Sequence, residues 1–133
     1  MAITNYDRVG KALELLKAGL GSFIEREFKS LFQARAQPQA IAFLGEDRIN
    51  SGKPISSWDV AALLKVMWES WNDVFRRTLG PAERSLVGEL RDHRNKWAHQ
   101  QTFSSDDAYR ALDSAGRLLA AISAGEADEI EKM

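Results

Sequence analysis

Apolar side chains recur every three or four residues through most of this chain, and that spacing constrains its fold more than any other feature. In the first segment the repeat continues over about six helical turns. Its members are Val9, Leu13, Leu16, Leu20, Ile24, Phe28 and Leu31. Such a stripe predicts an amphipathic helix over about residues 6–33. Gly19 and Gly21 inside it predict a kink or a close crossing with another helix.

Three further helices are expected from the same spacing, over about residues 56–79, 81–99 and 104–125. Gly80 and Pro81 separate the first two of these, because glycine suits the end of a helix and proline suits the first turn of the next one. A serine hydroxyl can accept a hydrogen bond from an unsatisfied amide at a helix start. The candidate caps are Ser56 or Ser57 and Ser104 or Ser105.

The last of these helices is expected to place Tyr109 and Leu112 on its inward face and to end at Gly125. The residues after it, 126–133, are acidic and are expected to form a tail or the start of a linker. We therefore expect one helical domain over residues 1–125.

The connection between the first two helices is long and rich in turn formers, over about residues 34–56. It contains a short apolar island, Ile41, Phe43 and Leu44. A long connection within a compact domain usually serves a function or contains a short element. We expect this island to dock on the core as one helical turn.

The expected fold class is all-α, an antiparallel bundle of about four main helices. No internal repeat and no β-hairpin signal occurs in the sequence. With 133 residues, the chain is long enough to bury about two-thirds of the surface that its unfolded form exposes.

Composition limits the classes of function. The formal net charge of −1 argues against a grip on nucleic acid by the whole surface, so any RNA contact requires a local basic patch. The chain has no cysteine, which excludes disulfides, thiolate nucleophiles and cysteine-ligated metals. Charges interrupt every apolar run, so neither a signal peptide nor a membrane-spanning helix is expected. We expect a soluble, cytoplasmic protein with no membrane partner.

The stretch 91–99, RDHRNKWAH, sets an arginine, an amide and a histidine within two turns of one predicted helix. With Arg91 at 0° and 100° per residue, Arg94 falls at about 300°, Asn95 at about 40° and His99 at about 80°. These four residues share one arc, beside a core stripe at about 220–260°. That stripe consists of Leu86, Leu90 and Trp97. The arc can be held by packing and still be reached by a ligand or a second subunit.

These residue types match the needs of RNA cleavage without a metal or another cofactor. The reaction requires a base for the 2′-hydroxyl proton, an acid for the leaving oxygen and cationic donors for the phosphate. Histidine has a pKa of about 6.5 and suits the first two roles, and the guanidinium group suits the third. One His99 cannot easily act as both acid and base. A homodimer would place two copies of His99 and Arg94 around one phosphate.

Residues 90–99, 103–104 and 107–113 resemble the C-terminal half of domains of the HEPN superfamily (higher eukaryotes and prokaryotes nucleotide-binding). The resemblance is specific over about residues 81–124 and loose before them. It implies an all-helical domain, dimerisation through the motif helices and, in active members, metal-independent endoribonuclease activity. Arg94 and His99 match the motif pair, and Asn95 matches the polar position after the arginine. Similar domains occur in large bacterial helicase-like and other ATPase proteins, many of them linked to defence.

Two hypotheses therefore stand side by side. In the first, the chain is an RNA-acting domain and an endoribonuclease, and its catalytic residues are Arg94, Asn95 and His99. In the second, it is a catalytically silent module. Such a module would serve dimerisation or RNA or nucleotide binding in a larger protein, whose N-terminal part this chain would form. A third possibility is that the motif has only a structural role. In that case its arginines pair with nearby carboxylates, and His99 is a solvated residue at the helix end.

Other residues are weaker candidates. Trp58, Trp68, Trp71 and Trp97 could stack on bases, but aromatic side chains at helical spacing are more often core. Asp106 and Asp107 are interpreted as charges that favour a helix start, and Arg76-Arg77 as a solvated helix end. His93 and His99 are six residues apart and point to divergent faces, so a shared metal is not expected.

Overall fold

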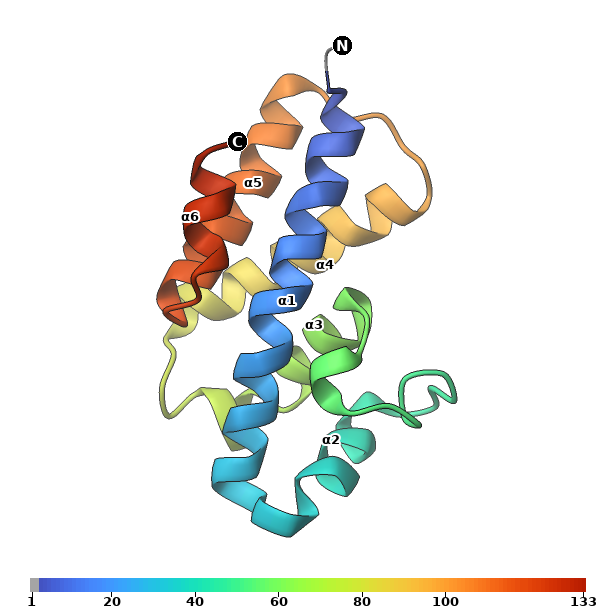
Figure 1. The fold of residues 1–133 in the computed structure, drawn as a ribbon, viewed down its shortest axis with the longest axis vertical. Coiled ribbons are helices and arrows are strands. Elements are labelled where there is room, and N and C mark those ends of the chain that lie inside the picture. Colours follow the sequence, from blue (N-terminus) through green and yellow to red (C-terminus); the bar gives the residue numbers. More distant parts are fainter. Residues whose placement is uncertain (1–2) are drawn as a thin grey trace.

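The computed structural model describes residues 3–133, which form an all-helical molecule arranged around α1 (Figure 1). The helical elements are α1 (Asn5–Phe32), η1 (Gln33–Arg35), α2 (Ala36–Leu44), η2 (Ile55–Ser57), α3 (Val60–Glu69), η3 (Trp71–Phe75), α4 (Pro81–Ala98), α5 (Ser105–Ala121) and α6 (Glu126–Glu131). No strand occurs in residues 3–133, which confirms the all-α prediction. Over the same residues, no helix has both the length and the apolar character needed to cross a membrane.

Helix α1 is the axis on which the other helices pack. It contacts α2, α3, η2, α5 and α6, and in Figure 1 α5 and α6 lie on one side of it, with α2 and α3 on the other. Its buried face contains Val9, Leu13, Leu16, Leu20, Ile24 and Phe28, as the periodicity predicts. Burial of each such side chain stabilises the fold by about 1.5–3 kcal/mol. Leu31, at the end of the stripe, is 39% exposed.

The two glycines inside α1 mark close approaches of neighbouring segments. The helix continues through both positions. A Cβ atom added at Gly21 would lie 2.7 Å from the backbone oxygen of Ser56, and one added at Gly19 would clash with the side chain of Leu119. Glycine is therefore required at position 21, where the η2 backbone contacts the helix, and at position 19 it leaves room for a side chain of α5.

The connection over residues 34–56 contains more structure than we expected. Helix α2 has nine residues, so the prediction of a single turn was wrong. Pro38 lies in its first turn, where the missing amide hydrogen would have had no partner in any case. Ala36, Ala40 and Leu44 are buried and fix α2 on the core.

The helix predicted over residues 56–79 is shorter than expected. Its cap is Asp59, whose side chain accepts from the amide of Ala62 at 2.9 Å, and not Ser56 or Ser57. The α-helix ends at Glu69, and the chain continues as a π-helical turn, η3, in which the Arg76 amide donates to the carbonyl of Trp71 at 2.8 Å. The buried Ser70 hydroxyl donates to the carbonyl of Val66, a local bond that disturbs a regular helix.

Helices α4 and α5 begin where the sequence predicts. Gly80 and Pro81 form the start of α4, and the Glu83 side chain accepts from the Gly80 amide at 2.9 Å. Ser104 caps α5 in a capping box with Asp107. This confirms the role of Asp107 as a charge at a helix start.

The C-terminal part of the chain differs from expectation in three places. Tyr109 was expected to face inward but is 74% exposed, because 100° per residue places it opposite the buried Ala111 and Leu118 of α5. Helix α5 ends before Gly125, where Ser123 adopts a φ of 58°. Residues 126–131 form α6, and its Ile130 is buried against the core. The acidic segment thus includes a helix that packs on α1 and α5.

The core interpretation of the tryptophans is confirmed for Trp58 and Trp71, which are 0% and 4% exposed. Trp68 and Trp97 are partly buried and pack against the same core. Trp68 packs against α4, and Trp97 is itself a residue of α4.

The close approach at Gly21 gives a test of this packing. We expect Gly21→Ala to lower the free energy of unfolding by about 1–3 kcal/mol, because the new methyl group would displace the η2 backbone. Urea denaturation followed by circular dichroism measures the change. Gly125→Ala is the matched control, since nothing lies within 4 Å of its Cβ position and its φ of −62° suits alanine. Equal stability of the two variants would contradict the packing described here.

Candidate functional site

The three candidate residues lie at the C-terminal end of α4. Arg94 and Asn95 are in its last two turns, and His99 is the residue that caps it. Arg94 is half-buried, whereas Asn95 and His99 are exposed. Within the described residues, none of these three side chains makes a hydrogen bond or an ion pair. All three are therefore free to contact a ligand.

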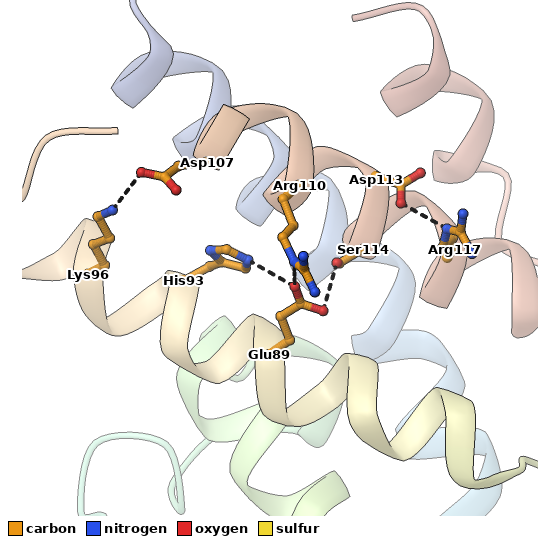
Figure 2. Close-up of polar contacts among 8 residues, drawn as sticks. All are labelled: Glu89, His93, Lys96, Asp107, Arg110, Asp113, Ser114 and Arg117. Atoms are coloured by element: carbon orange, nitrogen blue, oxygen red, sulfur yellow. Dashed lines mark hydrogen bonds and ion pairs between the residues drawn. The ribbon is translucent and has the colours of Figure 1, made fainter. Parts of the chain in front are cut away.

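The five residue steps from Arg94 to His99 correspond to about 140° of rotation and about 7.5 Å along a helix. Glu89 and Lys96 make the polar contacts of α4 with α5, and His93 lies beside Glu89 (Figure 2), whereas neither Arg94 nor His99 bonds to a described residue of α5. A single copy of α4 therefore presents its guanidinium and imidazole groups to neighbouring parts of the surface rather than to one point.

The backbone around His99 is held by its own hydrogen bonds. The amides of Gln100 and Gln101 donate to the carbonyls of Trp97 and Lys96, at 3.0 and 3.1 Å. This pattern is a Schellman motif, and Gln100 has the left-handed conformation that it requires, with a φ of 57°. A non-glycine residue in this conformation costs about 1 kcal/mol. The end of α4 is thus fixed at the position that His99 occupies.

The N-terminal turn of α1 clamps the same end of α4. The Tyr6 hydroxyl donates to the carbonyl of Trp97 at 3.0 Å, and the Trp97 indole donates to the carbonyl of Tyr6 at 3.2 Å. The two rings stack with their centroids 5.3 Å apart. Gly10 allows this contact, since a Cβ there would lie 2.9 Å from Trp97 Nε1. Sequence reasoning missed Tyr6, because nothing in the sequence pairs residues 91 positions apart.

The side of α4 that faces α5 carries a network of paired charges (Figure 2). Glu89 accepts hydrogen bonds from the Arg110 guanidinium and from the Ser114 hydroxyl, the latter at 3.2 Å. His93 Nε2 lies 3.7 Å from Glu89 Oε1. Further along, the Lys96 ammonium group bonds to Asp107 at 3.0 Å. Only the spacing of Glu89 and His93, four residues apart, signals part of this network in the sequence.

These contacts change the acidity of the carboxyl groups. Partial burial acts to raise the pKa of Glu89, but the hydrogen bonds from Arg110 and Ser114 and the proximity of His93 favour the charged form more strongly. The pKa of Glu89 therefore lies below its usual value. The hydrogen bonds from Lys96 and from Ser104 lower the pKa of Asp107 in the same way.

The arginines of α4 near the motif, unlike the charged residues of this network, have no charged partner in the described part of the chain. Arg91 and Arg94 are half-buried, yet neither has a carboxylate within 4 Å among residues 3–133. None of their guanidinium nitrogens is sealed from solvent. The charges of α4 are thus divided into a paired set that faces α5 and an unpaired set beside the motif. The alternative in which the motif arginines pair with Glu89 or Asp92 is wrong, because Glu89 pairs with Arg110 and Asp92 makes no ion pair in the described chain.

A sequence profile described as Swt1-like HEPN matches residues 11–123. The chain belongs to this HEPN family. The match includes α4 and α5 and therefore all three candidate residues. It confirms the HEPN resemblance and extends it to most of α1, where the resemblance was only loose. No curated protein and no solved structure matches the chain.

The Glu89 network of this HEPN domain makes its stability depend on pH. Because the pKa of Glu89 is lower in the folded than in the unfolded chain, its contribution is present above the unfolded value of about 4.3 and is lost as the pH falls through the folded value. We expect the free energy of unfolding to decrease on acidification from pH 6 to about pH 3. In Glu89→Gln the decrease should be shallower.

Urea denaturation at several pH values measures both slopes. Glu14→Gln is the matched control, because Glu14 is an exposed residue of α1 without a hydrogen bond to residues 3–133. Its slope should equal that of the wild type. Identical slopes for Glu89→Gln and the wild type would show that the network does not favour the ionised carboxylate.

Proposed function

We propose that this HEPN domain acts on RNA as a metal-independent endoribonuclease, and that two copies form the active site. Arg94, Asn95 and His99 carry the activity. The observation that supports this most directly is that these side chains have no partner among the described residues, although the helix end that bears them is held by Tyr6 and Trp97. A helix end with a fixed backbone restricts where its unpaired side chains can lie, and so limits the cost of positioning them around a substrate.

The chemistry follows from the three groups. One imidazole takes the proton of a ribose 2′-hydroxyl, whose oxygen then forms a bond to the adjacent phosphorus. The bond from phosphorus to the 5′-oxygen breaks, and a second imidazole donates a proton to that leaving oxygen. The products are a 2′,3′-cyclic phosphate and a 5′-hydroxyl end. Arg94 stabilises the charge that develops on the phosphate, and Asn95 orients it through its amide group.

Two chains are needed because the roles of base and acid call for imidazoles on opposite sides of one phosphate. Each chain has one His99, and its own Arg94 lies about 140° away around α4. A two-fold contact between the ends of two α4 helices would bring both pairs of groups to a shared cleft. Sedimentation should therefore detect a dimer. A strict monomer at high concentration would contradict the composite site.

A second function is a catalytically silent module that dimerises or binds RNA or a nucleotide through the same residues. The net charge of −1 favours it, because a free ribonuclease gains substrate affinity from a basic surface. The two functions differ in one measurable property, which is whether bound RNA is cleaved.

The test of the enzyme function is His99→Ala. We expect it to reduce RNA cleavage at least about 100-fold, as for loss of a general acid or base, and to leave the thermal midpoint nearly unchanged, because His99 is exposed and makes no side-chain hydrogen bond. Cleavage of a labelled single strand is followed between about pH 5 and pH 9, the range in which histidine titrates.

His93→Gln is the matched control, since it removes the other histidine of the chain from the α5-facing side of α4. It should keep its activity. Wild-type protein that cleaves no RNA in this range, or equal cleavage by His99→Ala, would overturn the enzyme proposal.

A further inference from the structure

Arg84, near the start of α4, is held in an unusual environment. Its guanidinium carbon lies 4.4 Å from the centroid of the Trp68 ring. Its Nε atom is buried and has no hydrogen-bond partner, whereas its two terminal nitrogens remain open to solvent. No carboxylate of residues 3–133 forms an ion pair with it. The group is fixed in place by an aromatic face and not by an acidic residue.

Gly88 explains how Trp68 reaches this position. A Cβ atom at Gly88 would lie 3.1 Å from the Trp68 ring, tighter than an ordinary contact. The absence of a side chain lets the indole lie against α4 one turn beyond Arg84. Arg84 can then stack on the ring, an arrangement that stabilises a cation by about 0.5–2 kcal/mol.

Arg84 lies on the same stripe of α4 as the motif. On the angular scale used above it falls at about 20°, beside Arg91 at 0°, Asn95 at about 40° and His99 at about 80°. The stripe extends about 22 Å from Arg84 to His99, and Arg94 lies at its edge. No acidic residue of α4 lies between these angles, because Asp92 falls at about 100° and Glu89 at about 160°.

The basic residues on the other side of α4 and on α5 behave differently. Lys96, Arg110 and Arg117 each bond to a carboxylate. Arg110 and Arg117 are about 70% exposed, where solvation already stabilises their charge. Arg84, Arg91 and Arg94 are less solvated and have no such partner. A partly buried guanidinium group without a counter-charge favours the binding of an anion.

We infer that Arg84 and Arg91, with Trp68 as support, form a phosphate-binding lane along α4. The lane extends the site at Arg94 and His99 towards the start of the helix. Its ligand is the backbone of single-stranded RNA, because a row of donors along one helix follows one chain of phosphates. This inference rests on the proposed function, since the lane leads to the cleavage site. It also accounts for RNA binding by a chain whose total charge is near zero.

The test measures RNA binding in His99→Ala protein, which prevents cleavage during the titration. A labelled single-stranded oligonucleotide is titrated at several salt concentrations. Each phosphate contact contributes about 0.7 to the slope of log affinity against log salt for a single strand. We expect Arg84→Gln and Arg91→Gln each to lower this slope by about 0.7. Arg84→Lys keeps the charge and should keep the slope.

Arg117→Gln is the matched control, because it removes the same charge from a residue that is paired with Asp113 on α5. Its slope should equal that of the parent protein. Circular dichroism checks the folding of each variant, and Arg91→Gln tests the lane even if loss of Arg84 from Trp68 disturbs the fold.

The outcomes separate the two proposals. Absence of RNA binding by the His99→Ala parent would overturn the proposed function together with the lane. Salt-dependent binding by the parent, with unchanged slopes in folded Arg84→Gln and Arg91→Gln, would overturn the lane alone. Equal affinity for the same strand annealed to its complement would overturn the assignment to single-stranded RNA.

Discussion

The ion pairs between α4 and α5 determine which charged groups of α4 have a partner within the protein. Glu89 binds Arg110 and Ser114 and lies next to His93, and Asp107 binds Lys96. These contacts occupy the side of α4 that faces α5, and the buried Val87 and Leu90 hold the helix against the core. With that side fixed, Arg84, Arg91 and Arg94 must lie away from the carboxylates of α5. The paired network and the unpaired arginines thus occupy different sides of one helix.

The same helix is held at its other contacts by groups that bear no charge. Tyr6 and Trp97 exchange hydrogen bonds at its C-terminal end, and Gly88 and Trp68 pack closely near its middle. Backbone carbonyls, aromatic faces and glycines can hold a helix without forming ion pairs with its guanidinium groups. The contacts that hold the end of α4 thus leave the guanidinium groups of Arg91 and Arg94, which we propose to contact RNA, without a partner in the described chain.

The sequence predicted the parts of the structure that depend on local chemistry. The periodicity and the caps located α1, α4 and α5 within a few residues, and the motif located the end of α4 on which the candidate site stands. The sequence could not predict α2, because Pro38 is compatible both with a turn and with the first turn of a helix. Nor could it predict the Tyr6 clamp or the stacking of Arg84 on Trp68, since both depend on how distant segments meet. To predict which charged residues of α4 form ion pairs, one must know which side of α4 is covered by α5.

The response of the arginine side chains to RNA tests the proposed site most directly. The Nε–H signals of arginine can be followed by nuclear magnetic resonance while a single-stranded oligonucleotide is added to His99→Ala protein. We expect the signals of Arg84, Arg91 and Arg94 to shift and those of Arg110 and Arg117 to stay unchanged. Shifts confined to Arg110 and Arg117, or equal shifts of all five, would contradict the division of charge on which the site depends.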